Sequence, residues 1–174
     1  SGVVGGFRNR AAGINSIVGG GVDNKAFNDN SAILGGALNI AEDAGVVVGG
    51  EQNSATSNNG GSGAFYSFVG AGFGNHADGN RTGIVVGTGN HVTGTDGVIA
   101  GGTENMVDNS TRAMIGAGFR DTILAAENSF IGGGRLNKIG GGPGGTANVS
   151  HGFIGGGQNN KIQSGFSSGN HNAI

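Results

Sequence analysis

Apolar residues recur along this chain at two fixed places in a repeating unit of 14 to 16 residues. The unit has 11 fixed positions, S-x-[VI]-x-[GA]-G-x-x-N-x-[AVI], and eleven copies follow one another, each with a variable joint after it. We number the fixed positions slots one to eleven. Slots three and eleven are apolar in every copy. The repeat predicts a single array over residues 1–174 with no separate second domain.

Two inward positions per copy predict two short β-strands per copy. The unit is too short to contain a helix, and β-branched residues that alternate with polar ones favour strands. Copies that stack at the strand spacing of about 4.8 Å form a parallel β-roll, or β-solenoid, in which each coil contacts only its neighbours. The expected fold is therefore all-β, with about eleven coils of 14–16 residues.

Slots six and nine carry the two most regular polar or small residues. Slot six is glycine in every copy, which indicates a coil corner with positive φ or without room for a Cβ atom. Asparagine at slot nine tolerates left-handed backbone, and its amide can bond to the asparagine one coil away, so we expect a stacked ladder. Its members are Asn9, Asn24, Asn39, Asn53, Asn75, Asn90, Asn105, Asn137, Asn160 and Asn172, with Asp121 as the single substitute.

Slots two and four face away from slot three, yet many of them are apolar, as at Ile17, Leu34, Val48, Val85 and Phe153. A strand that is apolar on both faces needs cover on both. The interior of the coil covers one face. Self-association covers the other, and three copies around an axis bury one face of each chain. We expect a homotrimer, with a monomer of broad coils as the alternative.

Length variation is confined to the joints, which predicts that all of them lie at one corner of the coil. Two joints are long, at 56–66 and 140–151. Loops on a rigid scaffold are where solenoids usually carry recognition. Phe65 and Tyr66 lie in the first loop and are candidates for stacking on a sugar, although a hydrophobic tuck explains them equally well.

Slot ten gathers basic side chains into one outward column, Lys25, His76, His91, Lys138 and Lys161, together with Arg10. These residues are a second candidate receptor contact, and their alternative explanation is a solvated face that prevents edge-to-edge aggregation. His76 and His91 fall on consecutive copies, but the repeat places no carboxylate beside them. We therefore predict no metal site.

Composition adds mainly exclusions. The chain has 42 glycines, one proline, no cysteine and a net charge of −2, which disfavours collagen, disulfide stapling and nucleic-acid binding. Its carboxylates show no paired inward geometry, and no glycine-rich stretch precedes Lys-Ser or Lys-Thr. We expect no enzymatic activity, no catalytic residue and no cofactor. Without an initiator Met, a signal peptide or a long apolar run, the chain reads as a mature or excised segment that does not insert into a membrane.

The motif as it stands in SIVGGGVDNKA (16–26), SAILGGALNIA (31–41) and SFIGGGRLNKI (129–139) resembles the head repeats of trimeric autotransporter adhesins. Similar arrays occur in tail-fibre proteins of aquatic phages. The resemblance covers the whole chain. It implies a left-handed parallel β-roll, three of which associate into an adhesive head on a bacterial surface or into a virion tail fibre.

These observations together predict a non-enzymatic, extracellular fibre segment that contacts a glycan or protein receptor on a cell. A structural filament subunit is the competing hypothesis, because the repeat begins at slot one with Ser1 and ends at slot eleven with Ile174, so copies can stack end to end. An ice-binding or carbohydrate-processing solenoid is disfavoured, since neither a Thr-x-Thr ladder nor an acid pair is present.

Overall fold

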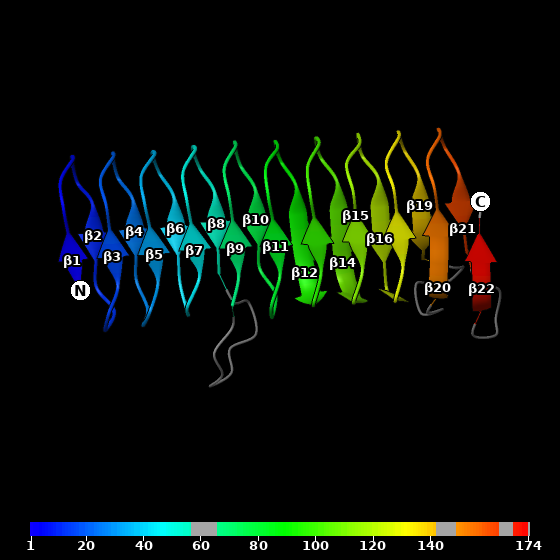
Figure 1. Ribbon diagram of the computed structural model, residues 1–174, viewed down its shortest axis with the longest axis horizontal. Coiled ribbons are helices and arrows are strands. Elements are labelled where there is room, and N and C mark those ends of the chain that lie inside the picture. Colours follow the sequence, from blue (N-terminus) through cyan, green and yellow to red (C-terminus); the bar gives the residue numbers. More distant parts are fainter. Residues whose placement is uncertain (57–65, 142–148, 164–168, 174) are drawn as a thin grey trace.

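The computed structural model describes residues 1–56, 66–141, 149–163 and 169–173, the last of these as backbone only. Within them the chain forms short strands and no helix. The strands pair in parallel, each with its counterpart one coil away, as between Ile17–Val18 and Ala32–Ile33. The coils stack in a row, so that the two ends of the chain lie at opposite ends of a rod (Figure 1). The predicted all-β parallel solenoid is confirmed.

Each of the first ten copies contributes one strand at slots two and three and another at slots ten and eleven. The first series comprises β1 (Gly2–Val3), β3 (Ile17–Val18), β5 (Ala32–Ile33), β7 (Val46–Val47), β9 (Phe68–Val69), β11 (Gly83–Ile84), β13 (Val98–Ile99), β15 (Met114–Ile115), β18 (Phe130–Ile131) and β20 (Val149–Ile154). The second comprises β2 (Arg10–Ala11), β4 (Lys25–Ala26), β6 (Ile40–Ala41), β8 (Ser54–Ala55), β10 (His76–Ala77), β12 (His91–Thr95), β14 (Met106–Thr111), β16 (Thr122–Leu124), β19 (Lys138–Gly140) and β21 (Lys161–Ile162).

Two further sets of pairings were not predicted. Slot seven forms a column of single parallel bridges that runs from Phe7 to Gln158. In the C-terminal half the joints also pair: β12 and β14 extend into them, β17 (Ala126–Glu127) lies there, and the first part of β22 (Gly169–Ala173) pairs with the joint part of β20. Corners and joints lie along opposite edges of the rod (Figure 1).

The core is a thin double column of slot-three and slot-eleven side chains. From Val18 and Ala26 to Ile154 and Ile162 these side chains are fully or almost fully buried. Burying one Val or Ile contributes about 1.5–3 kcal/mol, and most coils bury only these two positions, with Ala113, Ala126 and Val149 as additional buried residues. Slot-one hydroxyls line the same interior and close the joints: Ser16 Oγ donates to Gly13 O (2.8 Å) and Ser31 Oγ to Asn28 O (2.6 Å).

The sharp corner between the two strands depends on slots six and eight. The slot-six glycines have positive φ, and a Cβ atom on Gly36 would lie 2.1 Å from the carbonyl oxygen of Gly50 in the next coil. The left-handed residue that follows is at slot eight, as at Leu38 (φ 57°) and Gln52 (φ 57°). It is not the slot-nine asparagine, so the predicted left-handed role of that asparagine is wrong. The reversal at slot eight turns its N–H toward the preceding coil, as Leu38 N–H donates to Val22 O (2.9 Å).

The slot-nine asparagines form the hydrogen-bonded column that joins the coils. Oδ1 of Asn9 accepts the backbone N–H of Asn24 (3.0 Å). Nδ2 of Asn9 donates to Gly21 O in the next coil (2.9 Å) and to Gly5 O in its own (2.8 Å). Direct amide-to-amide contacts occur at some steps, such as Asn75 Nδ2 to Asn53 Oδ1 (3.0 Å). The contacts that repeat are therefore between side chain and backbone.

The eleventh copy does not have the predicted register. β22 pairs with β20 so that Asn172 lies opposite Gly152 and Ala173 opposite Phe153. Gly152 occupies slot one, so Asn172 also takes slot one and is not the slot-nine residue that the motif suggested. The predicted joint consisted of Gln163 alone. One residue spans at most about 3.6 Å, whereas the short joints elsewhere use three to five residues.

Two neighbouring glycines provide a test of the corner. Gly36→Ala places a Cβ against Gly50 O at positive φ, whereas a Cβ on Gly35 meets nothing within 4 Å. We predict that Gly36→Ala lowers the free energy of unfolding by about 2–4 kcal/mol. Gly35→Ala should change it by less than about 0.5 kcal/mol. Denaturant unfolding of both variants measures this, and equal effects would contradict the corner geometry.

Candidate functional site

The two loops proposed as contact regions lie mostly outside the described residues. Residues 57–65, which include Phe65, and residues 142–148 lie outside the described residues. Tyr66 is described, and 62% of its surface is exposed. It precedes β9 on the joint edge of the rod.

The slot-ten side chains lie on the outer face of the second strand series, but they do not form a continuous column. Register pairs Arg10 with Lys25, His76 with His91, and Lys138 with Lys161. Ile40 and Ser54 separate the first pair from the second. Met106 and Thr122 separate the second pair from the third. The structure thus brings the basic residues together two by two.

A carboxylate lies beside the histidines, contrary to the sequence interpretation. The residue after slot eleven, which we call slot twelve, faces outward beside slot ten, and in this coil it is Asp78. His91 Nε2 lies 3.1 Å from Asp78 Oδ2, and the rings of His76 and His91 meet edge to face at 6.1 Å. Burial alone would raise the pKa of Asp78, but hydrogen bonds from His91 and Thr56 outweigh it and lower that pKa. The same bond to Asp78 raises the pKa of His91.

Slot twelve carries carboxylates and hydroxyls in five consecutive coils: Glu42, Thr56, Asp78, Thr93 and Asp108. Thr56 Oγ1 donates to Asp78 Oδ1 (2.7 Å), and Thr93 Oγ1 donates to Asp108 Oδ1 (2.6 Å). Each hydroxyl bonds to the carboxylate of the next coil because parallel strands place residues of one slot side by side. The middle of this outer face is therefore an acidic, hydroxyl-rich band between basic ends.

A bulge next to this band opens a cleft. The joint that begins within β14 has one residue more than the joint that begins within β12. The pairing register of these two strands therefore shifts between Val92 and Gly94. Asn109 takes up the extra residue with φ 44°. Its N–H donates to Thr93 Oγ1 (2.9 Å), while Ser110 Oγ donates to Asp108 O (2.7 Å). The first bond ties the bulge to Thr93 of β12, and the second fixes the local turn within β14.

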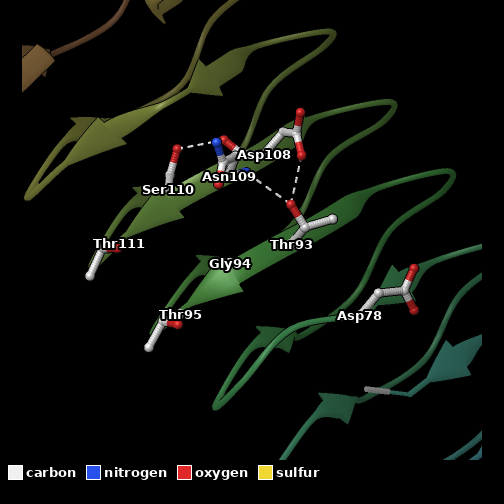
Figure 2. A pocket seen from close by; sticks show the side chains of 8 residues that line it. All are labelled: Asp78, Thr93, Gly94, Thr95, Asp108, Asn109, Ser110 and Thr111. Atoms are coloured by element: carbon white, nitrogen blue, oxygen red, sulfur yellow. Dashed lines mark hydrogen bonds between the residues drawn. The ribbon is translucent and has the colours of Figure 1, made fainter. Parts of the chain in front are cut away.

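The resulting cleft has a volume of about 460 Å³ and is lined by Asp78 and residues 93–95 and 108–111. Figure 2 shows the side chains of Thr93, Asp108, Asn109 and Ser110 close together on β12 and β14, with Asp78 one coil further along. The lining offers carboxylate oxygens, hydroxyls and backbone groups and has no aromatic side chain. Such a surface suits hydrogen bonding to a polar ligand rather than stacking.

Ion pairs between successive coils border the cleft at the joint tips. Arg81 makes two bonds to Asp96, at 2.6 and 2.9 Å. Arg112 contacts Glu127 and donates from Nε to Asn128 Oδ1 (2.6 Å). Exposed pairs of this kind are screened by solvent and contribute little to stability, so their main effect is to define the charge pattern of this edge.

Sequence reasoning missed the cleft because its residues lie in the variable joints. The outward Thr, Asp and Ser residues after slot eleven were the available signal. In the described part of the chain, no three His, Asp or Glu side chains are grouped so that they could hold a metal ion. Among the same residues, none forms a helix with the length and hydrophobicity needed to cross a bilayer.

Comparison with known proteins adds no family. No protein-family model matches the chain, and no curated protein is similar enough to be counted as a relative.

Proposed function

We propose that this chain is a non-enzymatic segment of a trimeric, extracellular surface fibre that mediates adhesion or receptor binding. The observation that carries the proposal is an exposed apolar stripe along the first strand series. The proposed left-handed coil and the autotransporter-like or tail-fibre-like assembly rest on the sequence motif.

The stripe consists of slot-two and slot-four side chains that project from the sheet into solvent. Leu34 and Val85, which directly follow β5 and β11, expose 57% and 51% of their surface. Monomeric soluble proteins rarely expose apolar patches of more than a few hundred Å². The exposed members are Val4, Ile17, Leu34, Val48, Phe68, Val85, Met114 and Phe153.

Slots two and four compensate each other in size, which keeps this face even. Where slot two is large, slot four is glycine: Phe68 precedes Gly70, and Phe130 precedes Gly132. The ring of Phe68 leans toward Gly70, with Cε1 3.5 Å from the place of a glycine Cβ. Small slot-two residues instead precede larger slot-four ones, as at Gly83 and Val85. An even apolar face packs well against another copy of itself.

The second strand series and the joint edge carry polar and charged groups instead of an apolar stripe. There the slot-ten cations, the slot-twelve carboxylates and the cleft are polar. If the apolar stripe faces the fibre axis, this surface stays outward and available to a glycan or protein receptor. A phage tail-fibre segment has the same requirements, and a structural filament subunit differs by polymerising.

The stripe is tested by adding charge to it. We predict that Val48→Asp combined with Val85→Asp dissociates the trimer, because each carboxylate would be buried without a partner at a cost of several kcal/mol. Ile14→Asp is the matched control, since Ile14 is 69% exposed but lies in a joint. Sedimentation equilibrium measures the masses. A double variant that keeps the wild-type mass would argue for a monomer, and wild-type polymers would favour the filament.

Adhesion is tested at the loop and at the slot-ten residues. Phe65→Ser with Tyr66→Ser should reduce binding of the purified segment to intact cells and to a glycan array, while the melting temperature stays unchanged. Asn15→Ser, on the same joint edge, should leave binding unchanged. If the loop variant binds normally, charge reversal at Lys138 and Lys161 tests the second contact. Normal binding by all variants would remove both proposed contacts.

A further inference from the structure

Asp121 is the single exception in the column of slot-nine asparagines. Its side chain has no exposed surface, like the asparagines on either side of it. It is also one of the few described residues with a buried oxygen that lacks a hydrogen-bond partner, namely Oδ2. This orphan atom lies in the interior of the corner and takes no part in the outer faces discussed above.

The neighbouring asparagines define the bonds that this position must make. Nδ2 of Asn105 donates to the carbonyl oxygens of Gly101 and Gly118, both at 3.0 Å. Nδ2 of Asn137 donates to Gly133 O (3.1 Å) and Gly157 O (2.9 Å). At each of these corners, therefore, one side-chain N–H₂ group faces two backbone acceptors.

Asp121 makes the bonds that the asparagines make through Oδ1 and the backbone N–H, but not those that they make through Nδ2. Its Oδ1 accepts the N–H of Asn137 (2.8 Å), and its own N–H donates to Asn105 Oδ1 (2.9 Å). Its Oδ2 stands where the other residues carry Nδ2, since it is the atom that a Cβ on the slot-six glycine, Gly118, would meet first, at 2.1 Å. By the pattern of the repeat, the acceptors at this corner are the carbonyls of Ala117 and Gly134. An ionised carboxylate has only acceptors to offer them.

The backbone also departs from the repeat here. Gly118 has φ 146°, the largest value among the described slot-six glycines, although Gly87, whose coil carries Asn90, also reaches 138°. A Cβ on Gly118 would lie 2.8 Å from Gly134 O, compared with 2.0–2.3 Å for the equivalent contacts elsewhere in the column. The corner is more open at the one coil that lacks the amide.

We propose that Asp121 is a neutral carboxylic acid in the folded chain at neutral pH, with its O–H replacing the missing amide N–H, and that its ionisation is a built-in, pH-sensitive weakening of this coil. The O–H donates to one of the two carbonyls that accept bonds from the amide N–H₂ group in other coils. Loss of the proton leaves a buried charge against carbonyl oxygens, a costly arrangement.

The direction of the pKa shift at Asp121 agrees with this assignment. Burial raises the pKa of Asp121, and the hydrogen bonds from Asn137 oppose it without reversing the direction. Charged residues from the adjoining segments face elsewhere. Glu104 and Arg120 pair with each other on the surface, Arg135 lies over the Phe119 ring, and Lys138 is on the outer slot-ten face.

The direction of the pH effect follows from the raised pKa. The folded chain holds a proton that the unfolded chain releases near the ordinary value of 3.8. The associated stability is therefore fully present below that value, and it is lost as the pH rises through the pKa of the folded state. An asparagine at this position makes the bonds at every pH, so the advantage of Asp121→Asn should grow with pH.

The experiment compares melting temperatures of wild type, Asp121→Asn and Asp23→Asn at pH 3.5, 7.5 and 9. We expect Asp121→Asn to melt several degrees above wild type at pH 9 and within about a degree of it at pH 3.5. Asp23→Asn, at a slot-eight position outside the column, should show no such growth. Asn105→Asp should reproduce the weakening one coil earlier, with the same dependence on pH.

Spectroscopic detection of the protonated carboxyl group completes the test. Infrared difference spectra between wild type and Asp121→Asn at pH 7 should contain the carbonyl band of a protonated carboxyl group. Absence of that band, or an advantage of Asp121→Asn that is the same at all three pH values, would overturn the proposal. If Asn105→Asp does not fold, the infrared spectrum and the Asp121→Asn series decide the question without it.

Discussion

The architecture depends on the side-chain amide of the slot-nine asparagine, which makes hydrogen bonds of the kind that a backbone amide makes. At most corners the slot-nine asparagine accepts an N–H from the next coil and donates to a carbonyl of that coil, while a further bond closes its own turn, as Asn24 does with Asn39, Gly36 and Gly20. Without it, the sharp turn at slots six to eight would leave buried backbone groups unpaired, at about 1–3 kcal/mol each. The corner can be tight only because this amide is present.

Because the core is thin, the hydrogen bonds of the slot-nine asparagine are more important for stability than they would be in a larger domain. Each coil buries mainly one slot-three and one slot-eleven side chain, such as Ile84 and Val92. Because each coil contacts chiefly its neighbours, stability is close to a sum of coil and interface contributions. A change at one corner therefore alters the stability of mainly that coil and its neighbours. The joints, by contrast, vary in length and carry the bulge at Asn109, the cleft and the paired charges without disturbing the column.

Sequence periodicity was sufficient for the parts of the fold in which every copy uses the same residue type. The buried slots, the glycine corner and the asparagine column are of this kind. The left-handed slot eight could not be read from the sequence, because it holds residues as different as Arg8, Leu38 and Glu104. Its conformation is imposed by the glycine and asparagine on either side. The register at Asn172 was misread because motif spacing ignores the length that a joint needs. The cleft lies in joints that the repeat does not constrain.

The most direct test of this account is the cost of removing one bridging amide. Asn90→Ala would leave the N–H of Asn105 without its partner and would remove one of the two donors to the carbonyl of Gly102, which keeps the N–H of Thr88. The account predicts that it lowers the free energy of unfolding by about 2–4 kcal/mol, at least as much as truncation of the fully buried Val92 to alanine. Asn15→Ala, on the exposed joint edge, should cost less than about 0.5 kcal/mol. If Asn90→Ala costs no more than Asn15→Ala, the core rather than the asparagine column holds the coils together.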